Sequence, residues 1–189
     1  MKTISIPLVN GWRFIKADDP SAGDLTMQAM SDLLDRADRG DCFGAPRFEW
    51  AQPSFDDSSW REVRVPHDWG VESPFDSDRR YGDAFLDVSG VGWYRIKLRV
   101  ENGKWKVGER SFSVPEDGKV YFECDGAMSY AMAFVNGEFA GGWPYGYTRW
   151  RIDITDHLRL RTRNQEPVIQ LIVLDSLEIF YYCYLQFFL

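Results

Sequence analysis

Two short stretches of the sequence bring together side chains that could bind a ligand. The first, Pro66-His67-Asp68-Trp69, places an imidazole, a carboxylate and an indole next to one another. These groups supply a hydrogen-bond donor, an acceptor and an apolar stacking face, which is the combination that a sugar needs. The alternative is structural, with Trp69 closing the edge of a sheet while Asp68 accepts backbone N–H groups of the following turn. Spacing alone leaves both roles open.

The second stretch is the loop 141–147, in which three aromatic rings stand among glycines and a proline. The rings are those of Trp143, Tyr145 and Tyr147. Glycine lets a loop approach another surface closely, and aromatic rings offer rigid contact area at a low entropic cost. The loop is therefore either a stacking platform for a ligand or an interface with another domain.

Other kinds of chemical site find little support. The sequence has no GxGxxG, P-loop, GxSxG or HExxH motif. Its only histidines are His67 and His157, too few for a histidine-rich metal site, and His157 follows Asp153-Ile154-Thr155-Asp156, which predicts a strand running into a capped turn. The adjacent Asp56 and Asp57 are expected to be solvated caps of a loop. We therefore predict no catalytic residue, no metal and no cofactor.

Composition describes a single globular domain with an unusual number of aromatic residues. The chain has 189 residues, 44% hydrophobic and 27% charged, enough for a sizeable core. Eight Trp suit an aromatic-rich β core or a sugar-binding surface. A net charge of -7 without long Lys/Arg clusters argues against nucleic acid or an anionic membrane as partner. The first residues form no signal-peptide core, so a cytoplasmic location is expected if the sequence is complete at its N-terminus.

The clearest predicted element is a strand from Trp93 to Val100, because apolar and polar residues alternate along it. Its apolar face contains Tyr94, Ile96, Leu98 and Val100, and its mostly cationic face contains Trp93, Arg95, Lys97 and Arg99. A period of two places the sets on opposite faces of a sheet. We expect a half-buried antiparallel strand whose three cations point to solvent, since a slip of one residue would bury them.

The remaining pattern predicts a β-sandwich. Six shorter strands are expected at Arg13–Lys16, Glu62–Val65, Val120–Cys124, Ala131–Val135, Trp150–Ile154 and Val168–Leu174. Asn136-Gly137 predicts a two-residue hairpin turn, since both residues tolerate a positive φ. One helix is expected, over Thr26–Arg39, within an insertion at 17–53. Many short strands with a single helix favour an all-β sandwich over an α/β sheet.

The last residues differ from the rest of the chain. Residues 177–189 read LEIFYYCYLQFFL, which is too short for a membrane span and, if exposed, prone to aggregate. The segment therefore packs on the domain, or its natural cover is missing. We divide the chain into a sandwich domain at 1–175 and an atypical apolar tail at 176–189.

Several motifs occur in an order that resembles the N-terminal sugar-binding domain of glycoside hydrolase family 2, which includes β-galactosidases, β-glucuronidases and β-mannosidases. The motifs are NGWRF at 10–14, FDDSSWREV at 55–63, VPHDW at 65–69, GWYR at 92–95, VNG at 135–137 and the segment from GYT at 146–148 to DIT at 153–155. The resemblance covers about residues 6–158. It implies a galactose-binding-domain-like jelly-roll β-sandwich that precedes an immunoglobulin-like domain and a catalytic (β/α)₈ barrel.

The same resemblance implies a role without catalysis of its own. The family's two catalytic glutamates lie on the barrel, one of them after an Asn, and this chain has no Asn-Glu dipeptide. By likeness, the segment with Asp68 approaches the active-site mouth, so the expected substrate-binding residues are His67, Asp68, Trp143 and Tyr145. The expected partners are a β-glycoside, the missing C-terminal domains and a second copy of the chain.

Two alternatives to this accessory role stay open. In the first alternative, the chain is a free-standing carbohydrate-binding module that uses the three rings of the loop 141–147 as its platform. In the second, it is a purely structural interface domain. From Ser176 onward the sequence no longer resembles the family, and the chain is expected to be a fragment of a glycosidase that is inactive alone.

Overall fold

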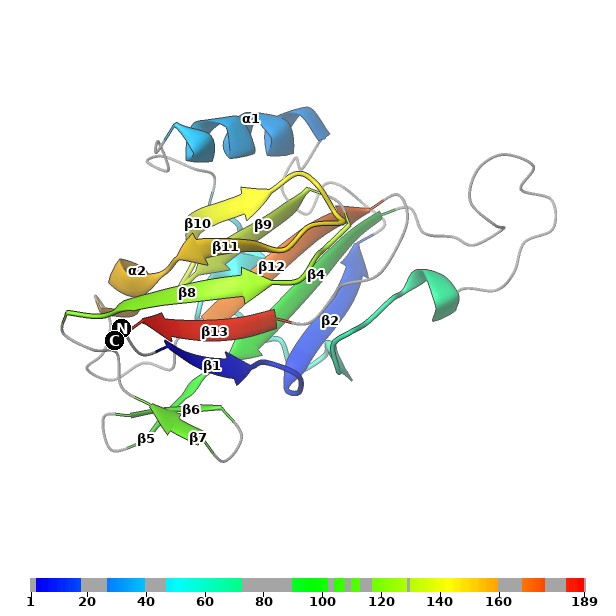
Figure 1. Ribbon diagram of the computed structural model, residues 1–189. Coiled ribbons are helices and arrows are strands. Elements are labelled where there is room, and N and C mark those ends of the chain that lie inside the picture. The colour runs from blue at the N-terminus through cyan, green and yellow to red at the C-terminus, as the bar shows by residue number, and fades with distance from the viewer. Residues whose placement is uncertain are drawn as a thin grey trace, which may run out of the picture.

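The strands form an antiparallel β-sandwich, which confirms the predicted fold class (Figure 1). The structure is a computed structural model that describes residues 3–17, 27–39, 47–72, 90–101, 104–107, 110–112, 117–128, 130–159, 168–175 and 183–188. One sheet of the sandwich has four strands and the other has six. Within the described ranges, no helix is long and apolar enough to cross a membrane.

The four-stranded sheet joins the two ends of the described chain. Its order is β1-β13-β8-β11, with bounds Thr3–Pro7, Cys183–Phe188, Lys119–Cys124 and Trp150–Asp153. Strand β13 pairs with β1 through Ile6 and Leu185 and with β8 through Leu185 and Phe122. Part of the predicted apolar tail is thus an inner strand of this sheet. Residues 176–182 and 189 lie outside the described residues.

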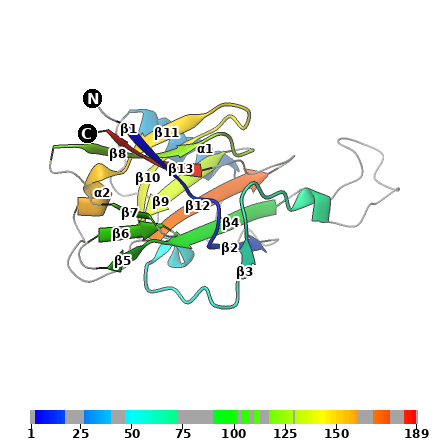
Figure 2. The same ribbon diagram turned by 60° about the horizontal axis from the view of Figure 1, so that its bottom comes forward.

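The six-stranded sheet contains five of the predicted strands, and the predicted strands Val120–Cys124 and Trp150–Ile154 are β8 and β11 of the other sheet. Apart from Trp93–Val100, each predicted strand has its ends within two residues of the expected bounds. The order of the six-stranded sheet is β10-β9-β12-β4-β2-β3, with bounds Glu138–Trp143, Ala131–Val135, Val168–Asp175, Gly90–Lys97, Trp12–Ala17 and Arg61–Val63. The expected strand Trp93–Val100 is interrupted at Leu98. Beyond it, β5 (Arg99–Glu101), β6 (Lys104–Val107) and β7 (Arg110–Phe112) form a separate three-stranded sheet, seen in Figure 2.

The main hydrophobic core lies between the two sheets. The six-stranded sheet contributes Trp12, Phe14, Tyr94, Ile96, Ala133 and Val135, and the four-stranded sheet Ile6, Val120, Phe122 and Trp150. Alternate residues of each strand point into this core, as the period of two predicted for Tyr94 and Ile96. Leu98 is also buried here, at 1% exposure, although it lies between two strands.

A second core covers the opposite face of the six-stranded sheet. Helix α1 (Met27–Asp38) confirms the predicted helix, and its Leu33 and Leu34 join the short helix η1 (Glu49–Ala51) over this face. Underneath them lie Val91, Trp93, Met132 and Phe134. The described part of the insertion therefore supplies a third layer. Residues 18–26 and 40–46 of the insertion lie outside the described residues.

This third layer corrects the prediction for β4. The strand is buried on both faces over Val91–Ile96, and Arg95 is 0% exposed instead of pointing to solvent. Lys97 and Arg99 are exposed, as expected. The alternation identified the two faces correctly, but the segment after η1 covers the cationic face at Arg95. Burial of Arg95 does not contradict the sandwich, because its guanidinium has polar partners.

The hairpin turn between β9 and β10 matches its prediction. Asn136 and Gly137 have φ values of 55° and 84°, as a type I′ turn requires, and Val135 pairs with Glu138. The Asn136 side chain donates a hydrogen bond to the His157 carbonyl at 3.0 Å. His157 lies in helix α2 (Thr155–Arg159), directly after β11, and is half-buried rather than on an open turn.

Candidate functional site

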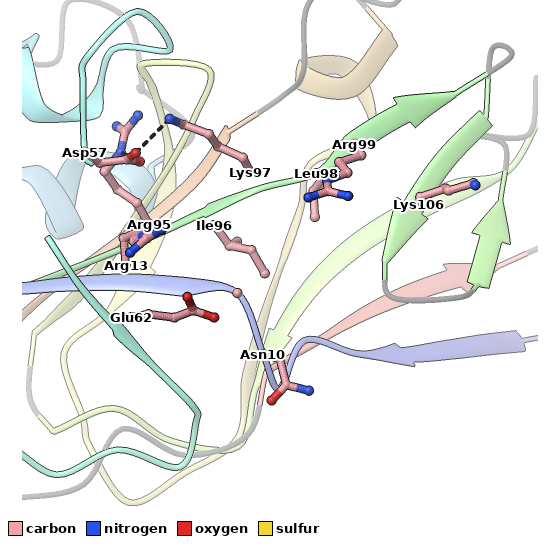
Figure 3. A pocket seen from close by; sticks show the side chains of 11 residues that line it. Asn10, Arg13, Asp57, Glu62, Arg95, Ile96, Lys97, Leu98, Arg99 and Lys106 are labelled. Carbon is pink, nitrogen blue, oxygen red and sulfur yellow. Dashed lines mark hydrogen bonds and ion pairs between the residues drawn. The ribbon is translucent and has the colours of Figure 1, made fainter. Parts of the chain in front are cut away.

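A hollow of about 600 Å³ opens beside the end of β4 and is rich in cations (Figure 3). Strands β2, β3 and β4, the loop before β3 and the hairpin of β5 and β6 contribute to its lining. The charged residues are Arg13, Arg95, Lys97, Arg99 and Lys106 against Asp57 and Glu62, and the others are Asn10, Gly11, Ile96 and Leu98. Positive charge thus predominates in this hollow, although the whole chain has a net charge of -7.

Arg95 holds one wall of the hollow in place. Its Nε donates to Asp57 Oδ2 at 2.9 Å, Nη1 donates to the Trp50 carbonyl and Nη2 donates to the Gln52 carbonyl at 3.2 Å. The guanidinium also lies over the ring of Phe55, 5.5 Å from its centroid. One side chain therefore ties four positions of the segment 50–57 to β4, and this bonding stabilises a charge that would otherwise be costly to bury.

Asp57 is the anionic centre of this wall, which corrects its prediction as a solvated cap. It is 6% exposed, and Lys97 Nζ donates to its Oδ1 at 2.7 Å while Arg95 binds Oδ2. Burial raises the pKa of Asp57, but the hydrogen bonds from Lys97 and Arg95 outweigh it and hold the pKa below its usual value. Asp56 does act as a cap, because its Oδ1 accepts from the Ser58 N–H at 3.0 Å.

Two pairs of like charges face each other across strands that line the hollow. Arg13 on β2 is the register partner of Arg95 on β4, and on its other side it is the partner of Glu62 on β3. Arg99 on β5 is the partner of Lys106 on β6. Figure 3 shows Arg99 and Lys106 at the end of the hollow away from Asp57 and Glu62. Like charges directly opposite each other in an antiparallel pair are unfavourable.

This hollow was not predicted from the sequence, although one signal pointed to it. The alternating cations Arg95, Lys97 and Arg99 were recognised, but they were assigned to solvent rather than to a common site. The hollow also needs the loop before β3 and the hairpin of β5 and β6, whose positions depend on the tertiary packing. Local periodicity carries no information about such distant neighbours.

The predicted site residue His67 belongs to the interior. It is 8% exposed, with Nδ1 2.8 Å from Tyr94 Oη and Nε2 3.0 Å from Arg61 Nη2 and 3.3 Å from Glu72 Oε1. Because arginine can only donate, Nε2 accepts and the neutral ring donates from Nδ1 to Tyr94. Burial lowers the pKa of His67, and Glu72 opposes this effect only in part.

Asp68 and Trp69 have the contacts that the structural alternative described. Asp68 Oδ1 accepts from the Gly70 N–H at 2.7 Å and from the Val71 N–H at 3.4 Å, at the start of helix η2 (Gly70–Glu72). Trp69 is 5% exposed and stacks on Phe14, with ring centroids 5.8 Å apart. A sugar contact from Asp68 would therefore have to come from its second oxygen, Oδ2.

The three rings of the aromatic loop 141–147, whose first residues form the end of β10, are exposed as a binding surface requires. Trp143, Tyr145 and Tyr147 are 38%, 56% and 60% exposed, and the two tyrosine rings lie 5.8 Å apart. Trp143 Nε1 donates to Thr148 Oγ1 at 2.8 Å, which braces the loop. Gly146 permits this conformation, since an added Cβ would lie 2.7 Å from Met128 Cα.

The predicted site residues do not converge. His67 and Asp68 follow β3, while Trp143 ends β10, and these strands are the opposite edges of the six-stranded sheet. Among the residues that the structure describes, no three His, Cys, Asp or Glu side chains come together as metal ligands would. The chain thus has three separate features: the cationic hollow, the aromatic loop and the buried His67 cluster.

Known proteins with similar sequences are much longer than this chain. It is 32% identical over 130 residues to the β-galactosidase BoGH2A of Bacteroides ovatus, a match that covers 68% of this chain and 13% of that protein. It is 32% identical over 115 residues to a putative β-glucuronidase of Formosa agariphila, covering 59% of this chain and 10% of that protein. No protein-family model matches the chain.

Solved structures show the same fold over nearly the whole chain. A glycosyl hydrolase family 2 member from Bacteroides cellulosilyticus superposes with a TM-score of 0.63 at 23% identity, over 97% of this chain and 20% of that one. The β-glucuronidase of Bacteroides uniformis gives a TM-score of 0.63 at 18% identity, over 98% of this chain and 18% of that one. At these identities the likeness establishes the fold.

Proposed function

The chain belongs to glycoside hydrolase family 2, as a partial, N-terminal domain, and on that premise we propose that it serves a larger glycosidase as a carbohydrate-contacting domain without catalysis of its own. The observation that carries the proposal is the match to a β-galactosidase over only 13% of that protein's length. The remaining length is where the chemistry and the other domains of such an enzyme would lie. The substrate class proposed for the whole enzyme is a β-galactoside or β-glucuronide.

The carboxylates of the hollow support a role without catalysis. Glycoside hydrolysis needs two carboxyl groups on either side of one bond, and one of them must donate a proton, which requires a raised pKa. Asp57 has a lowered pKa and is engaged by both Lys97 and Arg95. It is therefore a structural anion and a poor proton donor near neutral pH.

The exposed aromatic loop supports contact with carbohydrate. Trp143, Tyr145 and Tyr147 are exposed on a loop braced by the Trp143–Thr148 hydrogen bond. Aromatic faces stack on the apolar faces of sugar rings with little loss of side-chain entropy. The same rings suit an interface with another domain of the enzyme, which is the second candidate role of this surface.

Asp68 and His67 take different parts in the proposal. Asp68 is half-buried and reaches the surface beside η2, so its Oδ2 is the proposed contact to a sugar hydroxyl. His67 is buried, and its two ring nitrogens are hydrogen-bonded to Tyr94 and Arg61, which fixes the segment that carries Asp68 to β4 and β3. We therefore propose a positioning role for His67 in place of the expected direct contact.

Calorimetric titration of the purified chain tests the contact to carbohydrate. We expect neutral β-galactosides to bind, Tyr145→Ala and Trp143→Ala to abolish the heat of binding, and Tyr145→Phe, which keeps the ring, to retain it. If these alanine variants bind as the unmodified chain does, the contact to sugar is not made by this loop, and the interface role is favoured.

An assay with aryl glycosides tests the absence of catalysis. We expect the purified chain to leave nitrophenyl β-galactoside, β-glucuronide and β-mannoside intact, because the described acids offer no proton donor in a closed site. Turnover that disappears on substitution of one Glu or Asp would contradict this part of the proposal.

A further inference from the structure

We infer that the cationic hollow binds the anionic group of an acidic saccharide, either a uronate carboxylate or a sulfate ester. The saccharide part of this inference rests on the proposed function. The anionic part rests on the lining alone, in which five Arg or Lys side chains meet two carboxylates. The hollow is distinct from the aromatic loop, which lies after β10 at the other edge of the six-stranded sheet.

The charges are arranged so that one end of the hollow attracts an anion. At the other end, Asp57 lies between Arg95 and Lys97, and Glu62 is the register partner of Arg13. Arg99 and Lys106 form a like-charged cross-strand pair, and the two carboxylates of the hollow lie away from them (Figure 3). An oxyanion bound at this end, beside Arg99 and Lys106, would gain charge-assisted hydrogen bonds.

The size and the uncharged lining suit a small saccharide. A volume of about 600 Å³ lies within the range of sites for small molecules. Asn10 adds an amide that can donate to and accept from hydroxyl groups, and Ile96 and Leu98 belong to the uncharged part of the lining. A concave site favours a compact ligand over the broad face of a folded acidic protein.

The experiment measures binding to the full chain at low and high salt. The probes are methyl β-glucuronide, galactose 6-sulfate, the neutral methyl β-glucoside, inorganic sulfate and polyglutamate. The test variant is Arg99→Gln with Lys106→Gln. The matched control is Arg64→Gln with Lys104→Gln, which removes the same charge from exposed residues that do not line the hollow. Thermal unfolding of each variant verifies that it is folded.

We expect the two acidic saccharides to bind at low salt, and the neutral glucoside to bind at least about tenfold more weakly, because charge-assisted hydrogen bonds are the stronger ones. The test variant should lose about tenfold in affinity and the control should lose little. Added salt should weaken binding, since the attraction is largely electrostatic.

Four results would overturn the inference. The first is equal affinity for the acidic and the neutral sugars, and the second is equal affinity of the test variant and the unmodified chain. The third is inorganic sulfate bound as tightly as galactose 6-sulfate, which would mean an adventitious ion only. The fourth is binding of polyglutamate and of no saccharide, which would identify an acidic protein as the partner. The proposed function fails separately, if neutral saccharides bind nowhere. If Trp143→Ala lost all saccharide binding and the test variant lost none of its binding, this inference would be contradicted and the proposed function would stay intact.

Discussion

Arg95 and Asp57 form a buried ion pair, with 2.9 Å between Nε and Oδ2, that connects the inner strand β4 to a loop 38 residues earlier in the sequence. The pair sits where the third layer meets the six-stranded sheet, and Lys97 extends it to the cationic hollow through a 2.7 Å hydrogen bond to the same carboxylate. One carboxylate therefore serves both the packing of the insertion and the electrostatics of the hollow.

Replacing Asp57 by Asn should lower the free energy of unfolding by about 3–5 kcal/mol, because it leaves the buried Arg95 without its counter-charge. Urea unfolding measures this loss. The matched control is Asp56→Asn, at an exposed residue whose capping role an Asn can retain, and it should change the stability little. Similar stabilities for the two variants would mean that the Arg95 charge is satisfied by the carbonyls of Trp50 and Gln52 alone.

The buried His67 should make the chain less stable in mild acid. Burial lowers the pKa of His67 below its usual value of 6.5, so the unfolded chain takes up a proton at a higher pH than the folded one. Stability is fully present above about pH 6.5 and falls as the pH drops from there towards the lowered pKa of the folded state.

Denaturant unfolding across this pH range tests the role of His67. The variant His67→Gln should lose the pH dependence between 6.5 and the lowered pKa, whatever its stability at neutral pH. His157→Gln is the matched control for the loss of one histidine. An unchanged pH dependence in His67→Gln would show that another group is responsible.

Gly92 leaves the space that Trp69 fills. A Cβ at this position would lie 2.5 Å from Trp69 Cζ3, so Gly92→Ala should destabilise the chain by about 1–3 kcal/mol through overpacking. In the double variant Gly92→Ala with Trp69→Ala, the added methyl group meets no indole. The stability losses of the two single variants should therefore sum to more than the loss of the double variant. Additive losses would mean that Trp69 shifts without strain when the methyl group is present.

Asp68→Ala should lower the free energy of unfolding by about 1 kcal/mol, because the Gly70 and Val71 N–H groups lose their acceptor. Asp68→Asn, which keeps an oxygen acceptor, should lose less. In a complete enzyme that contains this domain, the proposed sugar contact predicts that kcat/KM falls more than the loss of stability explains. Unchanged kcat/KM with a lowered Tm would leave Asp68 a purely structural role.

The local elements could be predicted from the sequence because short-range patterns determine them. Asn136-Gly137 specifies its turn by the conformations that these residues tolerate, and the spacing of apolar residues gave α1 and the main strands. Burial of Arg95 could not be predicted in this way. It depends on which segment covers the outer face of β4, and a period of two distinguishes the faces without telling whether both are covered.

The candidate sites divide in the same way. The exposed loop with Trp143, Tyr145 and Tyr147 was identified from its composition, since glycine, proline and aromatic residues together are typical of a surface loop. His67 was expected to contact a sugar because it stands beside a carboxylate and an indole. Its burial depends on two partners distant in sequence, since it donates to Tyr94 on β4 and accepts from Arg61 on β3. Arg99 and Lys106 meet only because the chain turns back after β5.

The pairing of β1 with β13 affects the order in which the chain can fold. Strand β1 is at the edge of its sheet, and its ladder partner is β13, with Ile6 opposite Leu185. Contacts so distant in sequence form slowly, because a long loop must close before any pairing energy is gained. In chain order β1 precedes β13 by most of the described residues, so β1 has to wait for the strand with which it pairs. We therefore expect the first strand to join the sheet late, in a slow kinetic phase of refolding.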